Sequence, residues 1–183
     1  MSDSVEVKPG QRTLAELLGG LDDVRDAPKE VGTLELIVAR PAVDERQELA
    51  SAELVVDGGL AGDRWSQGSK SSLKSQLTVM NVRAAELVAG DRSRWSLAGD
   101  QLYVDFDLSL ENIPPGTKLE IGSAVIEVSD QPHLGCEKFS ARFGSAAREF
   151  ANSPNGTAVN FRGINTRVVQ AGTVRVGDTV RKS

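Results

Sequence analysis

From Val31 onward, the chain is a succession of short strand-like stretches, most of them separated by glycine or proline turns. The predicted strands are residues 34–39, 51–56, 77–80, 102–106, 118–121, 125–128, 167–169 and 174–176. Two predicted helices interrupt them, one over 82–88 after the N-cap residue Asn81 and one over 145–150. Many short strands with few helices favour a mainly β barrel, because closure of the sheet removes exposed strand edges.

The segment 1–30 follows a different pattern. Leu14, Leu17, Leu18 and Leu21 share one face of a short amphipathic helix, which Pro28 ends. We therefore expect an N-terminal helical arm at 1–30, packed on a main barrel domain at 31–183. A dimerisation arm is the alternative interpretation.

Composition excludes several classes of protein. The net charge of −5 argues against broad binding to nucleic acid or to an anionic membrane surface. No stretch approaches the roughly 20 apolar residues of a membrane span. Met1 to Glu6 lack the basic and apolar regions of a signal peptide. With a single cysteine there is no internal disulfide, so we expect a cytoplasmic protein.

Cys136 and His133 are the only cysteine and histidine of the chain, and they lie three residues apart. Pro132 and Gly135 argue against a helix there, so we expect the thiol on a tight loop that leaves a strand. A protonated His133 would lower the thiol pKa and raise the thiolate fraction. The alternative is a buried cysteine that acts as a small hydrophobe. A structural zinc site needs about four Cys or His ligands, so a classical zinc protein is excluded.

Two further motifs are candidates for binding an anion. Asp63, Arg64 and Trp65 follow a glycine-rich turn, where amides and Arg64 would bind the anion and Trp65 would offer a stacking face. The alternative is a turn in which Asp63 and Arg64 pair with each other. Arg162 and Arg167 flank Gly163, and arginine suits bidentate contacts with phosphate or carboxylate, although surface arginines often have no specific partner.

Several motifs occur in an order that resembles the MOSC family, named after the C-terminal domain of molybdenum cofactor sulfurases. They are Gly62-Asp63-Arg64, Leu110-Glu111-Asn112-Ile113 with the segment 115–122, the Cys136 loop, and the segment 172–178. The resemblance covers roughly residues 31–182. It implies a β-barrel and a cysteine that either carries sulfur or ligates molybdenum. In the family's molybdenum enzymes, the usual activity is reduction of N-hydroxylated compounds.

The sequence departs from the family pattern at two places. The family's cysteine commonly follows Arg-x-Pro, whereas His133-Leu134-Gly135 precedes it here, and Trp65 stands where a histidine often follows Gly-Asp-Arg. The chain also has no room for the pyridoxal-phosphate desulfurase domain of the fused sulfurases. A cysteine desulfurase would thus be a separate partner. A reductase would need an external electron-transfer partner, because the sequence shows no flavin, haem or iron–sulfur motif.

Three functions remain open. The first is a small reductase that binds a molybdenum–pterin cofactor through Cys136, with His133 at the rim of the pocket. The cofactor-binding residues expected to converge on Cys136 are Asp63, Arg64, Trp65, Asn112, Arg162 and Arg167. The second function is a sulfur-transfer module that carries a persulfide on Cys136. The third is a binding barrel without chemistry, in which Cys136 would be buried.

Overall fold

The computed structural model describes residues 8–68 and 71–183, so residues 1–7 of the predicted arm lie outside the described residues. All eight predicted strands are present, and β2, β4 and β11 are additional. The strands are β1 (Val31–Ala39), β2 (Gln47–Leu49), β3 (Ser51–Val55), β4 (Gly59–Leu60), β5 (Leu77–Asn81), β6 (Leu102–Asp105), β7 (Lys118–Ile121), β8 (Ala124–Val128), β9 (Ile164–Gln170), β10 (Gly172–Arg175) and β11 (Thr179–Lys182).

Seven of these strands form a closed barrel in the order β11-β7-β8-β9-β5-β6-β1, and β11 pairs with β1 to complete the ring. The predicted barrel is therefore confirmed. Strand β2 extends the sheet beyond β1, and β10, β3 and β4 form a separate small sheet. Within the ring, β5 and β6 run parallel, because α3 and η3 connect them. The chain is thus a mixed α/β structure built on a barrel.

The barrel interior is filled by apolar side chains. Along β8, for example, buried residues alternate with half-buried ones, as expected when one face of a strand points into the core. Leu34, Phe106 and Ile121 are among the interior residues with 0% exposure. Burying a side chain of this size contributes about 1.5–3 kcal/mol. The core therefore holds the barrel rigid and fixes the loops that leave its strands.

The predicted helices at 82–88 and 145–150 are confirmed as α3 and α5. The N-terminal pattern divides at Gly20 into two helices, and α4, α6 and the 3₁₀ helices were not predicted. The helices are α1 (Leu14–Gly19), α2 (Leu21–Arg25), α3 (Val82–Ala89), α4 (Glu137–Phe143), α5 (Ser145–Asn152) and α6 (Pro154–Ala158), with 3₁₀ helices η1 (Arg64–Gln67), η2 (Leu73–Ser75) and η3 (Arg92–Ala98).

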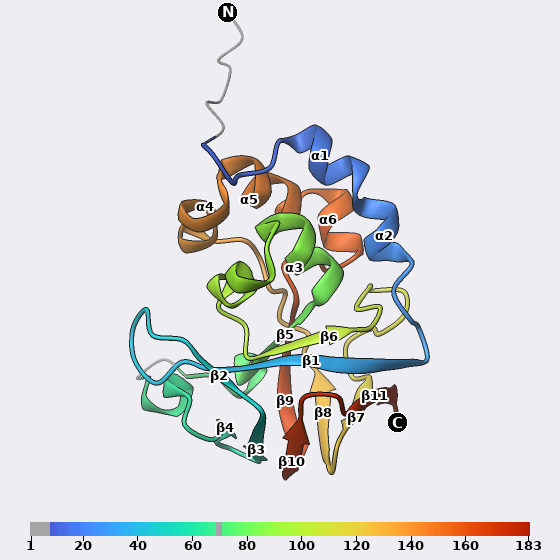
Figure 1. Cartoon of the computed structure of the whole chain (residues 1–183). Helices are drawn as coiled ribbons and strands as arrows, with labels where there is room; N and C mark the ends of the chain where they lie inside the picture. Colours follow the sequence, from blue (N-terminus) through green and yellow to red (C-terminus); the bar gives the residue numbers. More distant parts are fainter. Residues whose placement is uncertain (1–7, 69–70) are drawn as a thin grey trace, which may run out of the picture.

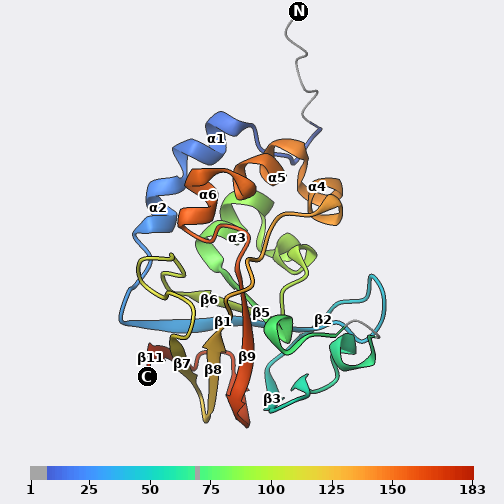
Figure 2. The same ribbon diagram turned by 180° about the vertical axis from the view of Figure 1, so that it is seen from behind.

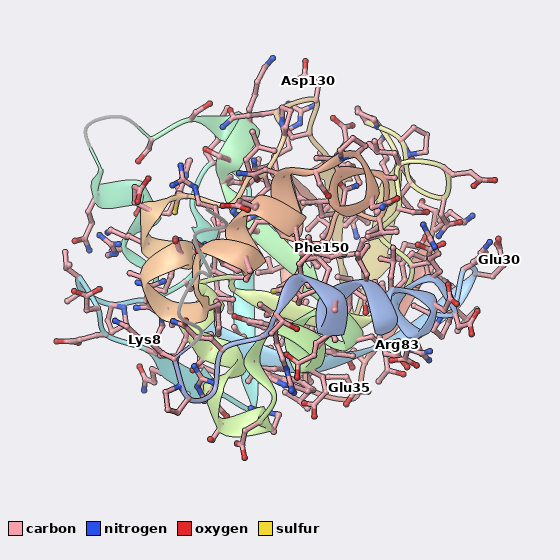
Figure 3. All side chains as sticks on the ribbon, turned by 90° about the horizontal axis from the view of Figure 1, so that it is seen from above. Lys8, Glu30, Glu35, Arg83, Asp130 and Phe150 are labelled. Atoms are coloured by element: carbon pink, nitrogen blue, oxygen red, sulfur yellow. The ribbon has the colours of Figure 1, made fainter. Side chains whose placement is uncertain are left out.

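The six α-helices gather on one side of the barrel, where the described chain also begins (Figures 1 and 2). A second apolar cluster lies beneath them and includes Leu17, Val24 and Phe150. Figure 3, which looks down on this helical layer, shows Phe150 near its middle. Helix α1 contacts α5 and α2 contacts α3, so the N-terminal helices pack on the rest of the described chain. No helix in the described residues is long and apolar enough to cross a membrane.

Candidate functional site

Cys136 lies where the loop that leaves β8 enters α4. It is the N-cap residue of that helix, and its carbonyl oxygen accepts the Ser140 amide at 3.0 Å. The thiol is exposed. The predicted placement on a loop after a strand is therefore confirmed, whereas the helix that begins there was not predicted. Phe139 and Phe143, four residues apart with ring centroids at 5.1 Å, bury one face of α4 and fix its first turn.

The pKa of Cys136 lies below its ordinary value. Partial burial of the sulfur opposes ionisation, but the amides of Phe139 and Lys138 and the charge of Arg162 outweigh it. Neither amide makes a close hydrogen bond to the neutral thiol, so their effect is to favour the thiolate once it forms. The structure thus provides a thiol that ionises readily, the form in which cysteine acts as a nucleophile or metal ligand.

A pocket of about 130 Å³ opens beside the thiol, and its charged lining is mostly cationic. The cationic residues are Arg40, Arg46, Arg64, Lys138, Arg142 and Arg162. Asp44 also lines the pocket, and it pairs with Arg142 at 3.6 Å. Two buried carboxylates, Asp63 and Asp100, lie behind the lining. Six cations against three carboxylates leave an excess of positive charge around Cys136.

The closeness of these cations affects the pKa of Arg46. Burial, followed by the nearby charges of Arg142 and Arg40, lowers the pKa of its guanidinium. The Nε atom of Arg46 donates to the Ser96 carbonyl at 3.1 Å, which holds the side chain in place despite the repulsion. An anion in the pocket would relieve this repulsion between like charges.

Asp63 holds one side of the pocket. Its carboxylate accepts from Arg40 Nε at 2.9 Å and Nη2 at 2.8 Å, and from the Trp65 amide at 3.0 Å. Burial alone would raise the pKa of Asp63, but the Arg40 contacts outweigh it and the pKa is lowered. Asp63 therefore positions Arg40 and caps η1, whereas its neighbour Arg64 lines the pocket itself. The predicted alternative, a pairing of Asp63 with Arg64, is replaced by the pair with Arg40.

Arg162 forms the opposite wall. Its Nη1 donates to Asp100 Oδ2 at 2.6 Å, its Nη2 donates to the Ala98 carbonyl at 2.8 Å, and its guanidinium lies 5.0 Å from the centre of the Phe139 ring. The residue is only 7% exposed. Its Nε and that of Arg64 are buried and have no hydrogen-bond partner among residues 8–68 and 71–183. Two unsatisfied cationic donors at one pocket favour an anionic ligand.

His133 is not placed to lower the pKa of Cys136, contrary to the expectation from the sequence. Its Nδ1 lies 3.6 Å from Asp100 Oδ1, and the ring lines a different cavity from Cys136. Burial, followed by the charge of Arg162, lowers the pKa of His133 to about 3. The ring is therefore neutral at neutral pH and supplies no imidazolium to the thiol. Arg162 supplies that positive charge instead.

The other predicted site residues lie outside the pocket lining. Trp65 is half-buried in η1, next to Arg64. The Asn112 amide donates to the Lys29 and Asp107 carbonyls, which ties the loop after β6 to the chain before β1. Arg167 is on β9 and pairs with Glu127 at 2.9 Å. The structure therefore brings Arg64 and Arg162 to Cys136, and it places Asn112 and Arg167 elsewhere.

Sequence reasoning missed several residues of this site. Arg40 and Arg46 line the pocket, and Asp100 anchors Arg162. A signal existed for Arg40, because it directly follows the buried strand 34–39, so its side chain had to lie at the rim of the barrel. Asp100 follows Gly99, which adopts a left-handed conformation at the end of η3. That turn gives no hint of a buried carboxylate.

This arrangement suits thiolate chemistry on an anionic ligand. No group of three or more His, Cys, Asp or Glu side chains in the described residues could hold a metal ion alone. A metal at Cys136 would therefore need most of its ligands from a cofactor. The pocket could instead stabilise a negatively charged sulfur adduct on the thiol.

The comparisons with known proteins identify the family of the chain. No curated protein matches it significantly. It is similar in fold to YuaD from Bacillus subtilis, with a TM-score of 0.60 and 15% identity over 82% of this chain and 94% of that one. It also resembles YiiM from Escherichia coli, with a TM-score of 0.55 and 19% identity over 82% and 69%. The MOSC domain model matches residues 69–181, more than half of the sequence, and the chain therefore belongs to the MOSC domain family.

Proposed function

We propose that the Cys136 pocket binds an anionic molybdenum–pterin cofactor and that the protein is a small reductase. The observation that carries this proposal is the excess of cationic side chains around an exposed thiol with a lowered pKa. A pterin cofactor presents a phosphate and a metal centre. The pocket offers arginine N–H groups that suit the phosphate and a thiolate that suits the metal.

The donor set fits such a group. The unsatisfied Nε atoms of Arg64 and Arg162 are matched to phosphate oxygens, and the Cys136 thiolate is a soft ligand that suits molybdenum. The pocket volume of about 130 Å³ is below the roughly 300–1,000 Å³ of a site that encloses a whole ligand. It would therefore hold the anionic end of a larger molecule.

Within this proposal, the protein binds and orients while the cofactor supplies two-electron redox chemistry when bound. Arg40, held by Asp63, and Arg162, held by Asp100, fix the positive charge before any ligand arrives. Cys136 would be held as a thiolate by the first turn of α4. The reaction implied by the family resemblance is reduction of an N-hydroxylated compound, with electrons from an external partner.

The test is metal content after expression with cofactor biosynthesis active. Wild type should hold molybdenum, and Cys136→Ser should lose it. Arg64→Gln should lower occupancy because an unsatisfied donor is removed, whereas Arg167→Gln is the matched control outside the pocket and should not. Wild-type protein without molybdenum under these conditions would contradict the proposal.

The second candidate is a sulfur carrier with a persulfide on Cys136. The small volume of the pocket favours it, since a persulfide anion needs no large cavity and the same cations would stabilise it. Incubation with a cysteine desulfurase and labelled cysteine should add one sulfur atom to wild type but none to Cys136→Ser. Unmodified wild-type protein in the intact-mass spectrum would exclude this role.

The third candidate, a binding barrel without chemistry, expects a buried cysteine. Cys136 is exposed instead, and cationic side chains surround it. The structure therefore gives the two thiol-based functions more support.

A further inference from the structure

A second cavity, of about 270 Å³, lies beside the Cys136 pocket and shares only Arg162 with it. The loops before β7 and after β8, the helix α6 and the start of β9 enclose it. Cys136 is not among its lining residues. Asp130 stands at its rim and projects at the edge of the molecule in Figure 3.

The walls of this cavity are mainly apolar. Ile113, Phe161 and Ile164 line it and are at most 4% exposed. Leu110 and Leu134 also line it, yet they are 50% and 51% exposed. Two half-exposed leucines at one opening leave apolar surface in water that a ligand would cover.

His133 gives the cavity a specific polar group. Its Nδ1 is buried and faces Asp100 Oδ1 at 3.6 Å, and the other oxygen of Asp100 is held by Arg162. This separation is longer than a hydrogen bond, but the negative charge of the carboxylate favours the tautomer of the neutral ring that has its proton on the nearer nitrogen, Nδ1. The lone pair of Nε2 is then an acceptor. The ring lines the cavity and makes no hydrogen bond within the described residues, so Nε2 is the ring nitrogen left to accept from a ligand there.

Asn165 adds a second acceptor. Its Nδ2 donates to the carbonyls of Gln131 at 3.1 Å and Pro132 at 3.3 Å. Those bonds orient the amide and leave its oxygen without a partner among the residues that the structure describes. Asn165 is itself only 4% exposed and lines the cavity. The cavity therefore offers hydrogen-bond acceptors, and a ligand that matches it would carry hydrogen-bond donors.

The charges around the cavity disfavour an anion. Arg162 is paired with Asp100, whose carboxylate lies 2.6 Å from Nη1, so the pair as a whole brings no net charge to this cavity. Asp130 at the rim adds negative charge, partly offset by Lys74 at 2.9 Å. This is the reverse of the Cys136 pocket, where cations are in excess.

We propose that this cavity is a second binding site, for a small uncharged molecule with a flat apolar body and an N–H or O–H donor directed at His133. It is a site of different chemistry from the thiol pocket, with Arg162, held by Asp100, as the shared wall. The inference does not depend on the reaction at Cys136.

Indole and N-methylindole are matched probes, because they share an apolar body and only indole has a donor. His133 is the only histidine, so its ring gives a single set of NMR signals in the full chain. Indole should shift these signals and bind about tenfold more tightly than N-methylindole, which leaves the buried acceptor unsatisfied. Equal affinities, or no shift of the His133 signals by indole, would overturn the proposal.

Variants separate this site from the thiol pocket. His133→Phe should keep binding of the apolar body and lose the preference for indole. Leu134→Ala should weaken both probes, whereas Val43→Ala, at a valine 63% exposed and outside the cavity, is the control and should bind as wild type. Cys136→Ser should also bind indole normally. If it does not, the cavity is not independent of the thiol site and the inference fails. Failure of the metal test would leave these binding results unchanged.

Discussion

At the scale of single residues, the structure separates the Cys136 thiol from the His133 imidazole, which the sequence suggested would act together at one site. Cys136 carries the exposed thiol, and two backbone amides and Arg162 favour its thiolate. His133, three residues earlier, turns toward Asp100 and stays neutral. Residues that are close in the sequence of a loop can have different electrostatic surroundings, because their side chains point in different directions.

His133 makes folding stability depend on pH. Its pKa is about 3 in the folded protein and about 6.5 when unfolded, so the unfolded chain binds one more proton between these values. Stability should therefore fall as pH falls below about 6.5, by about 1.4 kcal/mol per pH unit from this residue.

Urea denaturation at pH 7 and pH 5 tests this. From pH 7 to pH 5, wild type should lose roughly 2 kcal/mol more than His133→Asn, which cannot titrate. The comparison between the two proteins removes the contribution of carboxylates, which both share. An equal loss in both would show that His133 is not held neutral.

At the scale of elements, the turn before β9 sets the position of Arg162. Gly163 follows it with φ +106°, a conformation that favours glycine, and its amide donates to the Asn160 carbonyl at 2.8 Å. A Cβ at Gly163 would lie 2.5 Å from the Val79 carbonyl oxygen on β5. The close approach of two backbones thus holds the arginine against Asp100.

Gly163→Ala should destabilise the protein more than Gly177→Ala. Both glycines have φ near +100°, but a Cβ at Gly177 meets nothing within 4 Å. Backbone strain costs about 1–3 kcal/mol in each case, and only Gly163→Ala adds a clash worth about 1 kcal/mol or more. Thermal or urea denaturation of the two variants measures the difference, and equal destabilisation would exclude the Val79 contact as its cause.

The same scale shows what the sequence could predict. The strands with clear apolar patterns and the helices at α3 and α5 were predictable from periodicity. Helix α4 was not predicted, because Pro132 and Gly135 argued for a loop and the stretch is short. The spacing of Phe139 and Phe143 was the missed signal. Strand β11 is also short and half exposed, so its pairing with β1 depends on barrel closure, a long-range event.

At the scale of the whole molecule, the site depends on which loops the barrel brings together. Arg162 lies just before β9, and Arg64 lies beside the end of β1, where its amide donates to the Arg40 carbonyl at 2.9 Å. Arg167 is the fourth residue of β9 and a strand rises about 3.3 Å per residue, so it lies roughly 10 Å along the barrel from the start of the strand, which Arg162 precedes. The sequence alone could not show which of the two arginines, Arg162 or Arg167, lies at the site. The acidic net charge of −5 likewise hides a local excess of cations.

That local charge predicts how Cys136 discriminates between reagents. The ratio of the rate with anionic iodoacetate to the rate with neutral iodoacetamide should be higher for Cys136 than for a free cysteine peptide, because the cations attract the carboxylate of iodoacetate. Added salt should reduce this preference, since it screens the exposed charges. The double variant Arg64→Gln/Arg142→Gln should lower the preference several-fold, and Arg167→Gln should not. A preference that is insensitive to both salt and the double variant would show that the pocket charge does not act on the ligand.

The central claim is that the fold holds Cys136 as a reactive thiolate among cations. The most direct measurement is the rate of iodoacetamide labelling of the full chain from pH 5 to pH 10, compared with a cysteine peptide whose pKa is about 8.5. Cys136 is the only cysteine, so the labelling rate reports this site alone. The midpoint should lie below that of the peptide, and Arg64→Gln/Arg142→Gln should move it upward. A midpoint at or above the peptide value would contradict the account of the site given by the structure.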